Sequence, residues 1–329
     1  MKKDYYILKS GRLKRKQNTL YLETKEEKKP IPINEVNAIF VMGELDINTK
    51  LLVFLSQKRI PIHFFNYYGY YVGTYYPREY LNSGFLIVKQ VESYLDKEKR
   101  LKIAKEIVNS AIHNILKNLQ YYEKQGKDVS ESIKEIESER KQLGEVKDIP
   151  NLMGIEGRVR EYYYQSFNVV LRAGFEFEKR VKRPPDNMIN CLISFGNSLL
   201  YTTTLTEIYH TQLNPTISYL HEPGERRFSL SLDISEIFKP IITDRIIFSL
   251  VNNRIIKESH FLDELNFCYL NEEGRRTFIS MYDKKLKTTI MHKELKRKVS
   301  YQKLIRLECY KLIKHLIGEK EYEGFKSGW

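Results

Sequence analysis

Cysteine is scarce in this chain of 329 residues, which contains three of them. Cys191, Cys268 and Cys309 are dispersed and form no CxxC pair and no even set. This pattern argues against structural zinc and against a disulfide framework, and it fits a reducing compartment. We therefore expect a cytoplasmic protein in which the three thiols are small buried side chains.

Long apolar runs and nucleotide-binding motifs are also missing. No stretch approaches the roughly 18 apolar residues that a membrane helix needs. The basic segment 1–16 lacks the apolar core of a secretion signal. The sequence contains no P-loop and no GxSxG elbow, so nucleotide hydrolysis is not expected.

Positive charge, by contrast, is abundant. The 55 lysines and arginines outnumber the 42 aspartates and glutamates, which gives a formal net charge of +13. Such a surface attracts polyanions, and anionic membranes are disfavoured because no membrane helix is expected. The composition therefore predicts nucleic acid as the partner.

The pattern of the sequence changes once along the chain. Between Tyr5 and Tyr76, short runs rich in Tyr, Ile, Val and Phe alternate with Gly, Asn and Pro, which predicts strands. One segment of this part, INTKLLVFLSQKRI, has helical spacing. Further on, apolar residues recur at helical spacing. We predict an α+β protein with a small β-rich domain (1–76), a linker (77–85) and a larger all-α catalytic domain (86–329).

One window brings an imidazole and carboxylates close together in sequence. His221, Asp233 and Glu236 lie within HEPGERRFSLSLDISE. If LDISEIFK is helical, the two acids project from one face about one turn apart. Pro223 and Gly224 can form a turn that returns the imidazole towards them. Mixed imidazole and carboxylate ligands favour Mn²⁺ or Mg²⁺.

These residues also have ordinary structural explanations. A histidine beside a turn is often a surface or capping residue, and an acid pair at i, i+3 is often a solvated helix face. Arg226 and Arg227 could pair with the same acids. Glu156, between two glycines in GIEGRVREYYYQ, could face a ligand or form an i, i+4 ion pair with Arg160. Residue types alone leave these alternatives open.

Two other histidine patterns carry no chemistry in our interpretation. Glu207 and His210 form a single ExxH pair, whereas di-iron helical bundles contain two such pairs. His63, in IPIHFF, is interpreted as a strand residue rather than a ligand.

Several segments, in order along essentially the whole chain, resemble a known family. They are GYYVGTYYPREYLNSG, NLMGIEGRVREYYY, RPPDNMINCLISFGNSLLY, LHEPG with LSLDISEIFKPIITDR, and SYQKLIRLECYKLIKHL. Together they resemble the CRISPR-associated integrases that acquire spacers, the Cas1 family. Several ordered matches are more specific than any single motif.

The resemblance implies roles for particular residues. Glu156, His221 and Glu236 would hold Mn²⁺ or Mg²⁺, and Lys239 would hold a phosphate. Asp233 would either bind the ion itself or support the residues that bind it. Glu236 stands where many relatives carry Asp, which lengthens the ligand arm by one methylene. Tyr201 matches a motif position and could contact DNA or only pack. On the basic helical part, nucleic-acid contacts are further expected from Arg245, Arg275 and Arg276.

The resemblance also implies a function. It predicts a metal-dependent DNA endonuclease and integrase of CRISPR adaptation, which joins 3′-hydroxyl ends of short foreign DNA into the repeat by direct transesterification. Expected partners are double-stranded and branched DNA, a second copy through the N-terminal domain, and the small dimeric Cas2 protein. Two alternatives stay open: a catalytically silent basic DNA- or RNA-binding scaffold, and a metal phosphoesterase acting on small substrates.

Overall fold

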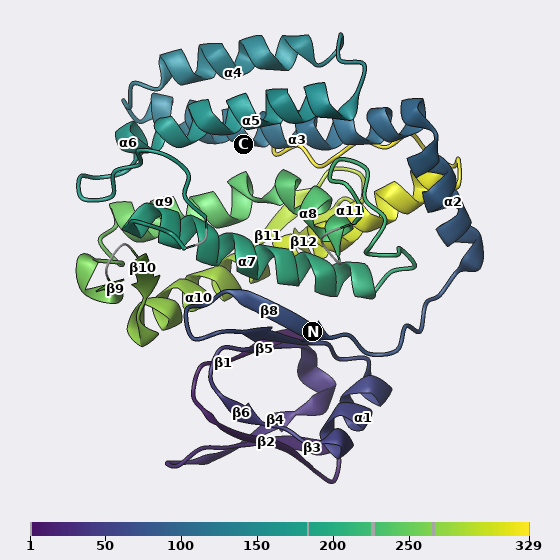
Figure 1. Ribbon diagram of the computed structural model, residues 1–329, viewed down its shortest axis with the longest axis vertical. Helices are drawn as coiled ribbons and strands as arrows, with labels where there is room; N and C mark the ends of the chain where they lie inside the picture. Colours follow the sequence, from purple (N-terminus) through teal and green to yellow (C-terminus); the bar gives the residue numbers. More distant parts are fainter. Residues whose placement is uncertain (1, 183, 225–227, 265–266, 329) are drawn as a thin grey trace.

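A computed structural model describes residues 2–182, 184–224, 228–264 and 267–328. Figure 1 shows a strand-rich N-terminal part joined by one extended connection to a larger helical part. The predicted order of a β-rich part followed by a helical part is confirmed. The domain bounds themselves stay a prediction.

The N-terminal part consists of two four-stranded sheets with one helix. The first sheet has the order β1-β5-β7-β8 and the second has the order β4-β3-β2-β6. Leu13, Leu20, Ile39 and Phe54 are fully buried in the core of this part. The elements are β1 (Lys3–Ile7), β2 (Gly11–Lys16), β3 (Thr19–Glu23), β4 (Lys28–Pro32), η1 (Ile33–Glu35), β5 (Val36–Val41), β6 (Leu45–Asp46), α1 (Thr49–Lys58), β7 (Ile62–Phe65) and β8 (Tyr71–Tyr75).

Helices make up most of the second part. The helices are α2 (Gly84–Leu95), α3 (Lys97–Lys124), α4 (Ser130–Gln142), α5 (Ile149–Gln165), α6 (Phe167–Val170), α7 (Met188–Tyr209), α8 (Ser229–Phe238), the π-helical segment η2 (Pro240–Asp244), α9 (Arg245–Asn252), the 3₁₀ turn η3 (Glu258–His260), α10 (Glu272–Lys287) and α11 (Tyr301–Leu316). Helices α2 and α3 meet at Asp96, whose side chain accepts the backbone N–H groups of Glu98 and Lys99 and caps α3.

The second part was predicted to be all-α, but it is not entirely helical. It also contains two antiparallel hairpins, β9 (Phe261–Glu264) with β10 (Phe267–Leu270), and β11 (Thr289–His292) with β12 (Arg297–Ser300). Each strand has four residues, which is too short for a period-2 pattern to stand out beside long helices.

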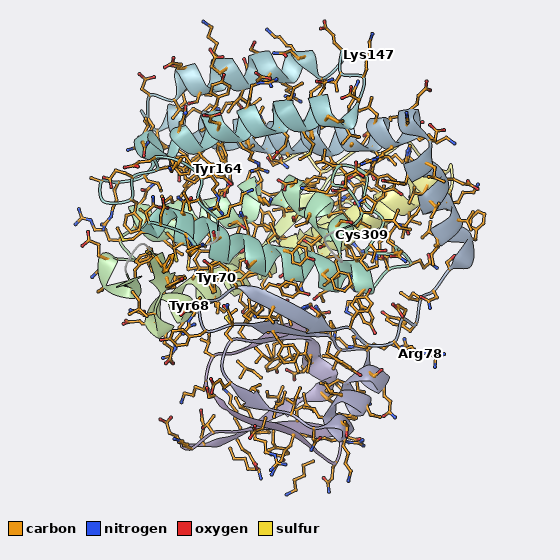
Figure 2. The ribbon with its side chains drawn as sticks, in the orientation of Figure 1. Tyr68, Tyr70, Arg78, Lys147, Tyr164 and Cys309 are labelled. Atoms are coloured by element: carbon orange, nitrogen blue, oxygen red, sulfur yellow. The ribbon has the colours of Figure 1, made fainter. Side chains whose placement is uncertain are left out.

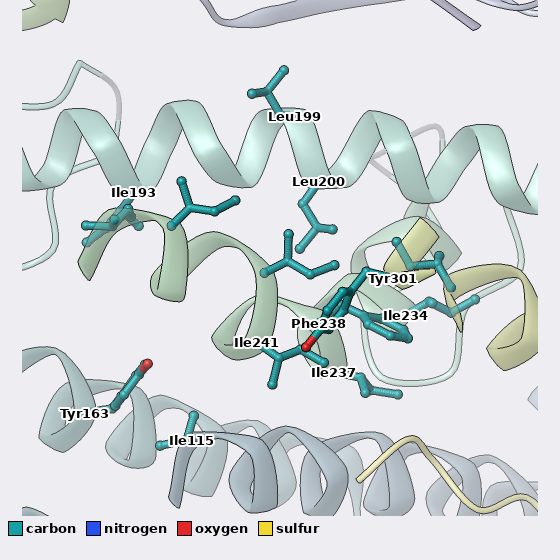
Figure 3. Packing of buried hydrophobic residues seen from close by; sticks show 14 of the residues in the cluster. Ile115, Tyr163, Ile193, Leu199, Leu200, Ile234, Ile237, Phe238, Ile241 and Tyr301 are labelled. Atoms are coloured by element: carbon teal, nitrogen blue, oxygen red, sulfur yellow. The ribbon is translucent and has the colours of Figure 1, made fainter. Parts of the chain in front are cut away.

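Helix α8 lies in the middle of the helical core. Ile234, Ile237 and Phe238 are fully buried, and Figure 3 shows them between α7 on one side and Ile115 of α3 on the other. Apolar packing on these faces fixes the rotation of α8, so its polar residues occupy the remaining face. None of the helices in the described part of the chain has the length and apolar character needed to cross a membrane. The three cysteines are buried, as expected.

Buried polar contacts attach the first sheet to the helices. The ring of His63 lies 2.7 Å from the Thr206 hydroxyl through Nε2 and 2.8 Å from the Thr74 hydroxyl through Nδ1. The carboxylate of Asp4 accepts from Gln302 of α11 at 3.0 Å and from Asn37 at 2.9 Å. His63 is therefore a buried strand residue whose two ring nitrogens are satisfied by protein hydroxyls.

The loop between β7 and β8 is a second attachment point. Tyr68 and Tyr70 lie where the two parts meet (Figure 2), and their rings are 4.2 and 6.3 Å from that of Tyr269 in β10. Arg275 of α10 donates to the carbonyl of Tyr67. The loop thus docks on the hairpin β9–β10 and on α10.

Asp4 is expected to make stability depend on pH. Burial raises the pKa of Asp4 from 3.8 to about 7, although the hydrogen bond from Asn37 opposes this. Between these two values the unfolded chain loses the proton while the folded chain keeps it, so ionisation favours unfolding and stability falls as pH rises. Asp4→Asn removes this loss. The unfolding free energy of Asp4→Asn minus that of wild type should therefore increase by about 2 to 3 kcal/mol from pH 5 to pH 8. This difference is measured by urea denaturation. The exposed Asp46→Asn is the control, and an equal effect of Asp4→Asn at both pH values would contradict the assignment.

Candidate active site

A pocket of about 890 Å³ lies between α5, α8 and the segment that follows α7. Of the five predicted catalytic residues, Glu156, His221, Glu236 and Lys239 line it. Asp233 is fully buried and lies behind His221. Further basic and aromatic side chains on the wall are Arg160, Tyr164, Lys179, Arg180 and Lys182. The structure therefore brings residues from α5, from the stretch before α7, from the segment after α7 and from α8 into one concave site.

Asp233 fixes the position of His221. Its Oδ2 accepts the backbone N–H groups of Tyr219 and Leu220 at 2.7 and 2.9 Å. Its Oδ1 lies 3.0 Å from the backbone nitrogen of His221 and 2.8 Å from Nδ1 of the ring. A carboxylate only accepts, so Nδ1 carries the proton and Nε2 is the ring nitrogen that can bind a metal.

The same contacts make His221 more basic. Burial lowers the pKa of His221, but the hydrogen bond to Asp233 and the negative charges of Asp233 and Glu236 outweigh it, and the net pKa is raised. The predicted ion pairs of Arg226 and Arg227 lie outside the described residues. The i, i+3 relation in α8 is confirmed as helical, and it places Asp233 behind the imidazole and Glu236 at the pocket wall.

Glu156 and Glu236 share one arginine. Arg160 donates through Nε to Glu156 at 3.0 Å and through an NH₂ group to Glu236 at 2.5 Å. Lys239 donates to the other oxygen of Glu236. Burial raises the pKa of Glu236, but Lys239, Arg160 and His221 outweigh burial and lower it to about 2. Glu156 therefore forms the i, i+4 ion pair with Arg160 and also lines the pocket.

The donor types suit a hard divalent cation. Two carboxylates and a neutral imidazole nitrogen in one pocket are ligands that Mn²⁺ and Mg²⁺ accept. Across the described part of the chain, however, no three His, Cys, Asp or Glu side chains are arranged to hold a metal. Arg160 and Lys239 hold the carboxylates of Glu156 and Glu236 in ion pairs.

Sequence reasoning missed a buried acid below Arg160. Asp244, at the end of η2, is 1% exposed, and neither of its oxygens has a hydrogen-bond partner among the described residues. Nη1 of Arg160 is likewise buried without a partner. Burial raises the pKa of Asp244 to about 7, although the charge of Arg160 opposes this. The one sequence signal is an acid within the apolar run PIITDRII.

The residues predicted to contact DNA lie outside this pocket. Tyr201 is half-buried, and its ring lies 5.3 Å from that of Tyr71 in β8. Arg275 is buried and held by Tyr67, whereas Arg276 is exposed and pairs with Glu272 at 3.0 Å. Arg245 donates to Asn118 at 2.7 Å. Their roles in DNA binding stay predictions, although burial leaves little of Arg275 for an external ligand.

Asp233→Asn is expected to damage both stability and activity. An amide has one acceptor oxygen for the backbone groups and the ring that Asp233 now binds, so the segment carrying His221 loses its support. We expect a lower melting temperature and strand transfer reduced about 10- to 100-fold, as for changes behind a metal ligand. The exposed Asp128→Asn is the control. Wild-type activity and stability of Asp233→Asn would show that Asp233 does not position His221.

Comparison with known proteins agrees with this site and fold. The family model described as CRISPR associated protein Cas1 matches residues 5–284. A protein from Thermodesulfovibrio yellowstonii named CRISPR-associated endonuclease Cas1 3 is 53% identical over 328 residues, which cover 99% of this chain and 100% of that protein.

Solved structures share the fold. A Cas1 protein from Thermotoga maritima has a TM-score of 0.91 at 48% identity, covering 98% of this chain and 100% of that chain. A casposase bound to its integration product has a TM-score of 0.88 at 20% identity, covering 99% of this chain and 94% of that chain, a likeness of fold. This chain belongs to the Cas1 family of CRISPR-associated proteins.

Proposed function

We propose that this protein is a metal-dependent DNA endonuclease and integrase of CRISPR adaptation. It joins 3′-hydroxyl ends of short DNA to phosphodiesters of the CRISPR repeat by direct transesterification. The observation that carries the proposal is the convergence of Glu156, His221, Glu236 and Lys239 on one pocket, in a chain with a net charge of +13.

Strand transfer conserves the number of phosphodiester bonds. The 3′-oxygen of the incoming DNA forms a bond to phosphorus, the bond to the repeat strand's own 3′-oxygen breaks, and the proton lost by the first hydroxyl is balanced by the one the second gains. No covalent protein intermediate is needed. Alignment of the strands and stabilisation of negative charge on the reacting phosphate account for the catalysis.

The residues of the pocket would have separate roles in strand transfer. Glu156, His221 and Glu236 would hold the divalent cation, which when bound supplies Lewis-acid stabilisation and activates the hydroxyl. Asp233 keeps the proton on Nδ1 of His221 and fixes the ring. Lys239 and Arg160 place two positive charges beside Glu236, where they can bind a phosphate oxygen.

DNA with two reacting ends requires two sites. A symmetric pair of chains meets this need, and we propose that the N-terminal sheets form the contact between them. Family membership further supports assembly with the small dimeric Cas2 protein. A casposase that shares this fold was solved bound to its integration product. We propose double-stranded and branched DNA as the substrates of this protein.

The proposal is tested with purified protein, branched DNA and Mn²⁺ on a denaturing gel. We expect joined and released strands in Mn²⁺ and none in chelator. A protein that bound the DNA equally in both conditions and altered no strand would be the silent scaffold instead.

Tyr201 offers a test of the direct mechanism. Its hydroxyl could be taken for a recombinase-type nucleophile, but its ring lies against Tyr71 and outside the pocket. Tyr201→Phe is therefore expected to keep substantial strand transfer, and no DNA should become attached to protein. Detection of a denaturant-resistant protein–DNA adduct in wild type would contradict direct transesterification.

A further inference from the structure

A second cavity, of about 630 Å³, lies between the C-terminal end of α3, α9 and α10. Its lining shares no residue with the active-site pocket. Four of the lining residues are basic, Lys127, Arg245, Lys284 and Lys285, and none is acidic. Aromatic side chains on its wall come from Tyr121, Tyr122 and Phe248.

The basic residues of this cavity are not neutralised by protein. Among the described residues, no carboxylate pairs with any of these four side chains. Arg245 is held by a neutral partner, the amide oxygen of Asn118 at 2.7 Å, and Nζ of Lys285 lies 4.2 Å from the ring centre of Tyr301. An anion in the cavity would therefore meet positive charge that no internal acid has satisfied.

The pKa of Lys285 reflects this lack of a neutralising acid. Burial and, as the smaller cause, the charge of Arg245 together lower the pKa of Lys285 to about 8. Two like charges held together in a partly buried site destabilise each other. A phosphate bound between them would relieve that repulsion.

The aromatic wall indicates which phosphate-bearing ligand fits. Tyr121 is 52% exposed, its ring packs edge-on against Tyr122 at 5.1 Å, and the Arg245 guanidinium lies 5.9 Å from its centre. An exposed ring beside cations is a platform on which an unpaired base can stack. The volume is also that of a small-molecule site, whereas the backbone of a duplex requires only a charged surface.

We propose that this cavity binds one unpaired nucleotide of a DNA strand. Its phosphate lies between Arg245 and Lys285, and its base stacks on Tyr121. The inference rests on the proposed function, because it assumes that DNA is the substrate. It adds a binding site for a single-stranded segment, separate from the site of chemistry.

The geometry also links the two sites. Asn118, which holds Arg245, donates to the Tyr163 hydroxyl at 3.0 Å and to the carbonyl of Pro240 at 2.6 Å. Tyr163 belongs to α5, the helix that carries Glu156. Arg245 is thus connected through Asn118 and Tyr163 to the helix that carries Glu156.

The test is binding in chelator, which excludes chemistry. Fluorescence anisotropy compares a duplex carrying a single-stranded oligothymidine overhang with a blunt duplex. We expect Tyr121→Ala, and separately Lys285→Met, to weaken binding of the overhang DNA about tenfold and to change blunt-duplex affinity less than about twofold. The exposed Lys16→Met and Lys298→Met are controls for loss of charge, and melting temperatures confirm folding.

Photocrosslinking adds a readout of position. An overhang containing 5-iododeoxyuridine should crosslink to Tyr121 in wild type. Equal weakening of both DNAs would show a general duplex surface, and unchanged affinity with no crosslink at Tyr121 would show that the cavity holds no nucleotide. Either result overturns the inference. Failure of the proposed function would give a different result: wild-type protein would still prefer the overhang DNA but would show no strand transfer in Mn²⁺.

Discussion

Glu236→Gln is expected to abolish strand transfer in Mn²⁺, with a loss of at least about a thousandfold. The side chain keeps its shape but loses the negative charge that a divalent cation requires, and charge stabilisation by a bound metal contributes several kcal/mol to such a reaction. Glu156→Gln should have the same effect. The rate is measured on a gel with a preformed 3′-hydroxyl end.

Stability must be followed in the same variants. Glu236→Gln leaves Lys239 and Arg160 with one carboxylate fewer, and removing one partner of a buried ion pair is destabilising. Assays are therefore run well below the melting temperatures of both proteins. The exposed Glu137→Gln on α4 is the matched control. Wild-type rates at limiting Mn²⁺ in Glu156→Gln or Glu236→Gln would remove that residue from the site.

DNA affinity is expected to respond to salt rather than to metal. Binding should persist in chelator and fall by about 10³ to 10⁵ between about 50 and 200 mM salt if six to ten phosphates are contacted. Each phosphate contact that is removed should reduce the slope of log affinity against log salt by about 0.9. With DNA that carries a single-stranded overhang, Arg245→Gln, Arg276→Gln and Lys239→Gln are expected to flatten the line, whereas Glu156→Gln should leave it unchanged.

The buried Arg275 provides an internal comparison. Because its guanidinium is bound to the carbonyl of Tyr67, Arg275→Gln should lower the melting temperature more than it changes the salt slope. Binding that is insensitive to salt would show that the basic surface is not the DNA track, and the small-substrate alternative would then gain support.

The local part of the site could be read from the sequence. Asp233 and Glu236 are three residues apart in an apolar run, so helical periodicity alone placed both acids on neighbouring positions of one helix. The turn residues after His221 predicted an imidazole close to them. Family resemblance then supplied Glu156, a residue whose own sequence context was equally consistent with a surface ion pair.

Contacts across long separations could not be read in this way. Arg160 reaches Glu236 across 76 positions, and Asn118 reaches Arg245 across 127. Neither pairing leaves a periodic or spacing signal, because it depends on how whole helices pack. The same limit explains Asp244, whose burial beneath Arg160 follows from the packing of η2 and not from its neighbours in the chain.

The central claim is that Glu156, His221 and Glu236 hold the cation that joins DNA ends. Calorimetric titration of Mn²⁺ into wild type and into Glu156→Gln, His221→Ala and Glu236→Gln, beside strand-transfer rates for the same samples, tests it most directly. We predict that Mn²⁺ affinity and strand transfer fall together in all three variants, with Glu137→Gln unchanged in both. Mn²⁺ binding as tight as wild type in all three variants, with strand transfer lost, would contradict the claim.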